Sequence, residues 1–279
     1  MRGKIKKNIS GIILYIVLVL GAILCLVPLY WLIRSSLMSI AQIFRLPPLW
    51  IPKPFRWRNY KDALTILPFH RFFINTIVIT SISMAGVLIS SSFCAFGFSR
   101  IKFKGRELIF ACIMSSMMLP YAVTMIPTFI GWRYLGAYGT IIPLIVPSWF
   151  GGGAFNIFLL RQFYKSIPKD LDEATIVDGG GFIRIWWQII IPLSTPATIV
   201  VGLFAFLNNW NDFFGPLIYL DAEIKYTLAL GLQLFKGMYN AQWHLMMAAS
   251  TVVLAPAVIV FLFGQKYFIE GITMSGLKT

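Results

Sequence analysis

Six long apolar segments constrain the fold of this chain more than any other feature of its sequence. A helix needs about twenty mostly apolar residues to cross roughly 30 Å of hydrocarbon, and each segment is long enough to do so. Backbone groups in lipid must bond internally, and none of the segments shows the alternation expected of a barrel strand. We therefore predict an all-α integral membrane fold, one transmembrane domain over residues 1–279, with spans near 11–33, 72–98, 108–130, 140–160, 193–220 and 243–264.

The composition agrees with a chain that has lipid as its main solvent. Hydrophobic residues make up 58% and charged residues 12%, where a soluble domain has about 25% charged residues. The first apolar run follows the basic residues Arg2, Lys4, Lys6 and Lys7. It is longer than the roughly 7–15 residues of a signal-peptide core and ends in no small-x-small cleavage site, so we predict an uncleaved first span.

The formal net charge of +14 raises the possibility of a nucleic-acid partner. The chain has no nucleic-acid motif and no room for a soluble binding domain, so basic loops beside the spans explain the charge better. With both termini inside the cell, the inner segments hold 14 of the 24 lysines and arginines and the outer segments hold 10. This modest bias predicts that both termini are cytoplasmic.

No residue pattern predicts catalysis or metal binding. Cys25, Cys94 and Cys112 lie in apolar runs without metal-ligand spacing and are typical of small core residues. His70 and His244 sit at the edges of spans with no carboxylate or cysteine spaced around them, which favours interfacial histidines over ligands. The sequence contains no nucleophile elbow, no H-E-x-x-H motif and no paired carboxylates, so we do not expect an enzyme.

The first outer loop, residues 34–71, holds seven basic residues and one acid, Asp62. Its prolines and tryptophans are typical of an ordered segment at the membrane interface. The charge permits two interpretations: a solvated or lipid-contacting loop, or a surface that attracts an acidic binding protein or an acidic sugar.

Prolines within the spans predict kinks, with an ordinary helix end as the alternative at any one of them. These prolines are Pro120, Pro127, Pro143, Pro147, Pro216 and Pro256.

The polar loop 161–192, between the fourth and fifth spans, is the most informative part of the chain. Pro168 suits the first turn of a helix, and acidic residues follow where they face the positive end of the helix dipole. Glycines 179–181 then end the helix, which would run over 168–181 outside the bilayer. One face would carry Leu171, Ala174, Thr175 and Asp178. Its small, acidic character favours docking onto protein over docking onto lipid.

This loop resembles the EAA loop of bacterial ABC-type importer permeases. The matching residues are Glu173-Ala174-Thr175, Asp178-Gly179-Gly180, Ile189, Ile191-Pro192 and Pro196. The chain departs from the family pattern at Thr175 and Gly180, where alanine is usual, at Trp186 for phenylalanine and at Ile191 for leucine. Residues 158–168, 210–217 and 265–268 are similar to the carbohydrate-uptake, maltose-permease-G-like branch, and the resemblance covers nearly the whole chain.

The resemblance implies that the loop is a coupling helix seated in a cleft of a separate ATPase. The coupling residues would be Leu171, Glu173, Ala174, Thr175, Asp178, Gly179 and Gly180. It also implies a second permease chain, with a related heterodimer partner favoured over an identical copy, and an extracytoplasmic sugar-binding protein. The permease itself would lie in a bacterial inner membrane. The chain has no phosphate-binding G-x-x-x-x-G-K-[ST] loop, so ATP and Mg would bind the partner ATPase subunits and this chain would need no cofactor.

Polar residues within spans are candidates for lining a sugar pathway. They are Asn75, Tyr121, Asn156, Asn208, Asn209, Trp210, Asn211 and Asp212. Hydrogen bonding between helices is the alternative for any single asparagine. Two other functional classes fit less well: an ion-driven carrier needs intramembrane acids, and a scaffold or sensor needs no docking helix beside kinked spans.

Overall fold

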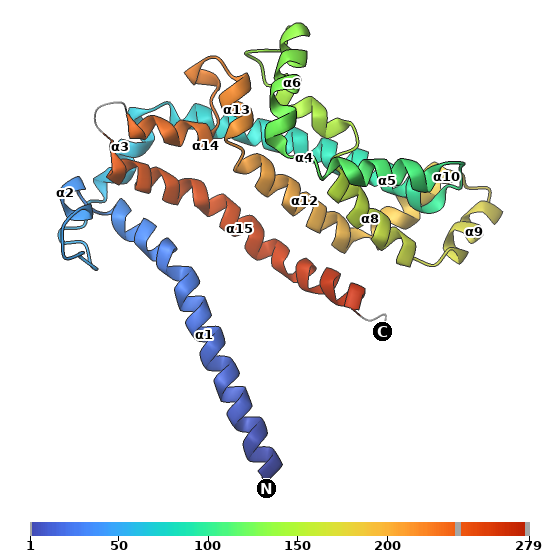
Figure 1. The fold of residues 1–279 in the computed structure, drawn as a ribbon, viewed down its shortest axis with the longest axis horizontal. Coiled ribbons are helices and arrows are strands. Elements are labelled where there is room, and N and C mark those ends of the chain that lie inside the picture. The colour runs from blue at the N-terminus through green and yellow to red at the C-terminus, as the bar shows by residue number, and fades with distance from the viewer. Residues whose placement is uncertain (1, 238–240, 277–279) are drawn as a thin grey trace. The chain divides into compact units, whose positions relative to one another are not determined.

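In the computed structural model, residues 2–237 and 241–276 are described, and every described regular element is a helix (Figure 1). Side chains are described for residues 11–237 and 241–267, which leaves out the four N-terminal basic residues and Phe268. Lys278, counted among the inner basic residues, lies outside the described residues. The predicted all-α membrane fold is confirmed.

The chain divides into two compact units, residues 1–68 with 232–255, and residues 69–231 with 256–279. The helices of the first unit are α1 (Arg2–Ser36), α2 (Ile40–Ile43), α3 (Arg58–Ile66), η4 (Leu232–Lys236) and the first part of α15 (Trp243–Gly276). In α1 the apolar residues from Ile12 to Val27 are exposed, and Gly11 and Gly21 have open space around them. Such a helix needs lipid or another chain to cover it.

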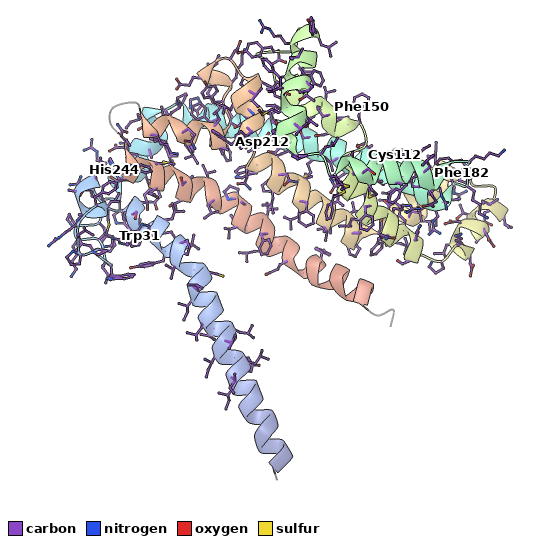
Figure 2. The ribbon with its side chains drawn as sticks, viewed as in Figure 1. Trp31, Cys112, Phe150, Phe182, Asp212 and His244 are labelled. Carbon is purple, nitrogen blue, oxygen red and sulfur yellow. The ribbon has the colours of Figure 1, made fainter. Side chains whose placement is uncertain are left out.

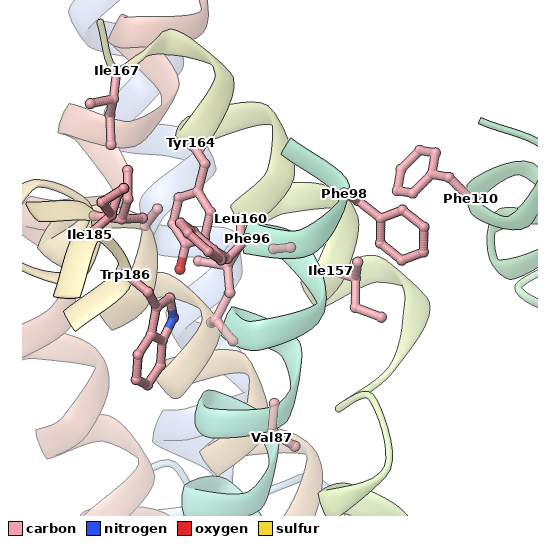
Figure 3. Packing of buried hydrophobic residues seen from close by; sticks show 14 of the residues in the cluster. Val87, Phe96, Phe98, Phe110, Ile157, Leu160, Tyr164, Ile167, Ile185 and Trp186 are labelled. Carbon is pink, nitrogen blue, oxygen red and sulfur yellow. The ribbon is translucent and has the colours of Figure 1, made fainter. Parts of the chain in front are cut away.

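The second unit is built around α4 (Phe69–Arg100). Its other helices are α5 (Arg106–Ser116), α6 (Tyr121–Tyr134), α7 (Ile142–Ile145), η1 (Val146–Trp149), α8 (Ala154–Ser166), α9 (Asp170–Val177), α10 (Phe182–Arg184), η2 (Ile185–Ile190), α11 (Ile191–Leu193), α12 (Thr195–Trp210), α13 (Phe214–Tyr219), η3 (Glu223–Lys225), α14 (Leu228–Gly231) and the rest of α15. Helices α8 and α12 pack along α4. The buried core between them includes Phe96, Leu160, Tyr164 and Trp186 (Figure 3).

Four helical segments are long and apolar enough to cross a membrane, and the number rises to six if each of two bent pairs of helices forms one span. The third predicted span bends by 98° between α5 and α6, and the fifth bends by 82° between α11 and α12. The first bend lies at Pro120, where the sequence predicts a kink or a helix end, and the second lies at the start of the predicted span 193–220. Pro120, at the N-cap of α6, and Pro196, in the first turn of α12, have no N–H to continue the preceding helix.

The fourth span is also irregular, because α7 and η1 end in the glycines 151–153 before α8 begins. Serines on α4 satisfy its backbone: the Ser83 hydroxyl donates to the Leu144 carbonyl at 3.2 Å and the Ser90 hydroxyl to the Ser148 carbonyl at 3.0 Å. A hydroxyl is a suitable partner here because no water is available within the bilayer.

Gly152 allows this irregular segment to lie directly against α4. Its φ is +64°, and a Cβ there would lie 2.7 Å from the Val87 carbonyl oxygen and 3.0 Å from Ser91 Cβ. We expect Gly152→Ala to destabilise the protein by about 2 kcal/mol, from left-handed strain and the close approach together. Thermal unfolding in detergent measures this, with Gly21→Ala, which has open space, as the control. Equal midpoints for the two variants would contradict the prediction.

Candidate coupling helix and cavity

The predicted coupling helix is present as α9, but it is shorter than expected. It begins at Asp170 after the N-cap Lys169, so Pro168 precedes the helix and does not occupy its first turn. Asp170, Asp172 and Glu173 lie in the first turn, as expected, where negative charge is favourable.

The C-terminus of α9 is closed by glycines. Gly179 has φ +77°, and its N–H donates to the Ile176 carbonyl at 2.9 Å, while the Gly180 N–H donates to the Thr175 carbonyl at 2.8 Å. These two bonds form a Schellman motif, which needs a left-handed residue and is therefore best served by glycine. A Cβ on Gly180 would lie 2.7 Å from Thr175 Cγ2, so the turn is fixed tightly.

None of the residues of α9 is buried. The helix and the segment after it expose large apolar side chains, of which only Leu171 belongs to the small, acidic face predicted from the sequence. These are Leu171, Ile176, Val177, Phe182, Ile183 and Trp187, and we call them the apolar patch. Figure 2 shows the Phe182 side chain at this end of the second unit. Beside it, residues 181–184, Trp187 and Gln188 line an open hollow of about 660 Å³. This surface fits a protein partner.

An ion pair holds α9 to the end of α4. Arg100 Nε lies 3.3 Å from Asp172 Oδ2, and the Arg100 side chain is only 3% exposed. Arg100 also donates through Nη2 to the Ile167 carbonyl at 2.9 Å. Burial raises the pKa of the Asp172 carboxyl, while the charge of Arg100 opposes that rise. We call this pair the α4–α9 clamp. Because α9 has no buried side chain of its own, the clamp is its main described attachment to α4.

A second arginine joins three helices nearby. Arg161 on α8 is 5% exposed and donates from Nη2 to both carboxylate oxygens of Glu107 on α5, at 2.6 and 2.7 Å. Its Nε donates to the Phe98 carbonyl at the end of α4 at 3.1 Å, and its guanidinium lies 3.9 Å from the centre of the Phe110 ring.

The chain entering α9 and the chain leaving it meet at a buried polar cluster. Ser92 on α4 lies 2.9 Å from the Tyr164 hydroxyl on α8, and the Trp186 Nε1–H donates to the Ser92 hydroxyl at 2.8 Å. Phe93 stacks on Trp186 with ring centres 3.9 Å apart. Figure 3 shows Tyr164 and Trp186 packed within the same cluster. Both connections of α9 therefore join a rigid core around α4.

Three of the eight predicted pathway residues come together around one cavity of about 490 Å³. Asn156, Asn208 and Asn209 line it, with Gly152 and Phe204 among its other residues. Two of the amides also bond within their own segment: Asn156 to the Gly152 carbonyl and Asn209 to the Ala205 carbonyl, both at 2.7 Å. Each amide keeps further hydrogen-bonding capacity toward the cavity.

The other five candidates lie elsewhere. Asn75 donates to the carbonyls of Ile224 and Tyr226 at 2.9 and 3.0 Å, which fastens a loop to α4. Trp210 is 3% exposed, its ring against Phe73 and Phe206.

Tyr121 is 53% exposed at the start of α6, and Asn211 donates to the Leu207 carbonyl at 2.9 Å. Asp212 lies at the turn between α12 and α13, where Oδ1 accepts the Gly215 N–H at 3.1 Å (Figure 2). That any of the eight candidates lines a sugar pathway stays a prediction.

Sequence reasoning missed the clamp residues Arg100 and Asp172. It also missed Arg161 and Glu107, whose ion pair between α8 and α5 we call the junction. In the sequence, Arg100 and Arg161 are two of the 14 basic residues of the inner segments, and Asp172 is one of the acids after Pro168. Each pair joins residues more than fifty positions apart. The one available signal was an isolated charge at the edge of an apolar run, which is weak.

Within the first unit, the loop after α1 is folded. Asn59 donates to the carbonyls of Ser36 and Met38, both at 2.8 Å, and Tyr30 donates to the Trp50 carbonyl. Arg34 is 2% exposed, lies over the Trp31 ring and donates to the Leu49 carbonyl, so it is not available to an external ligand. The other six basic residues of the segment are exposed.

Comparison with known proteins places these features in a family. Residues 83–273 match the profile described as the binding-protein-dependent transport system inner membrane component. The chain is 31% identical to the arabinooligosaccharides transport system permease protein AraQ of Bacillus subtilis, covering 100% of this chain and 99% of that protein. It is 31% identical to the probable starch degradation products transport system permease protein AmyC of Thermoanaerobacterium thermosulfurigenes, over 95% and 97%.

Solved structures share the fold. One chain of a bacterial ABC transporter involved in the import of the acidic polysaccharide alginate is 26% identical, with a TM-score of 0.82 over 94% of this chain and 97% of that one. A chain from the alginate transporter in complex with its alginate pentasaccharide-bound periplasmic protein gives a TM-score of 0.65 at 15% identity, over 92% and 94%.

Proposed function

The chain belongs to the family of binding-protein-dependent transport system inner membrane components, and from that premise we propose that α9 is the helix through which a separate ATPase drives it. The protein is a multi-pass permease subunit of an ABC importer for sugars or oligosaccharides. It is not an enzyme, since ATP hydrolysis belongs to another subunit of such importers.

One observation carries the assignment of α9: it is a short, fully surface-lying helix whose only described side-chain link to α4 is a buried ion pair. Its connections on both sides run into the core cluster at Ser92, Tyr164 and Trp186. A displacement of α9 would therefore move α4, α8 and η2 together, as packed elements do in domain transitions. The apolar patch supplies the contact area for the ATPase.

The proposed assembly contains a dimer of ATPase subunits, which bind ATP and Mg, and a second permease, a related heterodimer partner. An extracytoplasmic binding protein delivers the sugar. The crystal structure of the alginate transporter in complex with its periplasmic protein supports the presence of such a binding protein. We place the chain in a bacterial inner membrane with both termini cytoplasmic. In this arrangement Asn156, Asn208 and Asn209 line part of the sugar pathway, and the partner permease supplies the opposite wall.

ATP hydrolysis and sugar uptake by the whole complex in liposomes test the role of α9. Glu173→Lys and Gly179→Trp alter the exposed face of the helix, and we expect substrate-stimulated hydrolysis and uptake to fall toward basal levels. Glu223→Lys is the control for charge reversal, and Gly136→Trp is the control for a left-handed glycine in open space, with φ +70°. Normal transport by both α9 variants would remove α9 from the mechanism.

We propose in addition that the sugar is acidic. Five exposed basic residues of the first unit, Arg45, Lys53, Arg56, Arg58 and Lys61, favour an anionic ligand, and the similar alginate transporter imports an acidic polysaccharide. The triple variant Arg45→Gln, Arg56→Gln and Arg58→Gln should slow uptake of a uronate oligomer several-fold at low salt and remove its salt dependence, because steering by exposed charges is screened. Unchanged uptake at all salt concentrations would exclude this substrate class.

A further inference from the structure

A pocket of about 280 Å³ lies beside the α4–α9 clamp, and nearly all of its lining is cationic. Its residues are Ser99, Arg100, Lys102, Arg106, Lys165 and Lys169. The end of α4, the start of α5, the end of α8 and the residue before α9 each contribute at least one positive charge. Neither Glu107 nor Asp172 is among the lining residues.

The lining includes a buried cation with spare hydrogen-bonding capacity. Arg100 has a side chain 3% exposed, and its Nη1 has no hydrogen-bond partner among the described residues. Its Nε lies at 3.3 Å from Asp172 without a well-formed hydrogen bond. A buried guanidinium donor without an acceptor costs free energy, so it marks a place where an acceptor is missing.

The remaining cations are only partly neutralised. Arg106 pairs with Glu107 at 3.0 Å, and that carboxylate is shared with Arg161. Lys102, Lys165 and Lys169 have no carboxylate within 4.0 Å in the part of the chain whose side chains are described. Helix C-termini attract cations, which accounts for single charges at the ends of α4 and α8. It does not account for five cations around one hollow.

We infer that this pocket binds a phosphate-bearing anion, either a phospholipid headgroup or free inorganic phosphate. Arginine guanidinium groups and lysine ammonium groups around a concave site suit the oxygens of a phosphoryl group, and basic pockets between membrane helices hold anionic headgroups. The bound oxygens would take the free donors of Arg100 next to Asp172. Occupancy would therefore change the strength of the clamp, a consequence for coupling that rests on the proposed role of α9.

The test uses the purified complex and a variant in which three exposed lysines are neutralised: Lys102→Gln, Lys165→Gln and Lys169→Gln. The matched control, Arg133→Gln, Lys236→Gln and Lys266→Gln, removes the same charge from exposed cations outside the pocket and outside the first outer loop. Native mass spectrometry counts phosphatidylglycerol retained against phosphatidylcholine, and calorimetry measures the affinity for inorganic phosphate. We expect the pocket variant to bind the anion about 10- to 100-fold more weakly than the control.

The two sources give different results. Selective retention of phosphatidylglycerol that inorganic phosphate does not displace identifies a lipid headgroup, whereas saturable phosphate binding that competes with the lipid identifies free phosphate. Equal anion binding by the pocket variant and the control would overturn the inference. So would loss of the ATPase subunit from the pocket variant with anion binding unchanged, because the cations would then serve protein docking.

Discussion

Arg100→Gln is expected to separate ATP hydrolysis from sugar uptake in the assembled transporter. The substitution leaves the Asp172 carboxylate, whose side chain is 14% exposed, without its cation, and removes the donor to the Ile167 carbonyl. Breaking one side of a buried ion pair costs about 3 kcal/mol, which is enough to release α9 from α4. Sugar transported per ATP hydrolysed should fall by at least about tenfold, since 1.4 kcal/mol already corresponds to that factor.

Lys225→Gln is the control for this prediction. It also removes a cation from an ion pair, here with Asp221, but both side chains are 42% exposed, and ion pairs exposed to water contribute little. The double variant Arg100→Asp with Asp172→Arg should recover part of the coupling, because the attraction is kept and only the bond to Ile167 is lost. A normal ratio of uptake to hydrolysis in Arg100→Gln would show that the clamp does not transmit the movement of α9.

Arg161→Met is expected to lower the stability of the second unit strongly. The methionine keeps much of the apolar volume but loses the bond to the Phe98 carbonyl and the contact with the Phe110 ring. These interactions are buried, and together they contribute about 3 kcal/mol. The thermal unfolding midpoint of the purified protein in detergent measures the loss.

Glu107→Gln separates this effect from the ion pair itself. Glu107 is 62% exposed, and the glutamine keeps an amide oxygen that can accept from the buried Arg161, so the variant should lose less stability than Arg161→Met. If Glu107→Gln destabilises the protein as much as Arg161→Met does, the ion pair, and not the contacts with Phe98 and Phe110, holds α4, α5 and α8 together.

Sequence reasoning was most successful where local chemistry decides the outcome. Lipid offers no partner for backbone groups, so six apolar segments dictated helices and a membrane fold. The helix outside the bilayer was predictable for the same kind of reason, since acids favour its start and the glycines at 179–181 close its end. The resemblance in this loop identified the family that the comparisons then confirmed.

Only the tertiary structure decided which helix ends meet. The sequence around Arg100 does not predict that Asp172 is its partner, and the sequence around Arg161 does not predict Glu107. Such ion pairs depend on how the helices pack. Pro120 indicated a kink or a helix end in the third span, but the size of that bend, 98°, and the 82° bend at Pro196 were decided only by the structure. The hydropathy of a segment depends on its own residues, and it decides whether that segment lies in lipid or in water. The clamp, the junction and the cationic pocket instead arise from contacts between segments far apart in the chain.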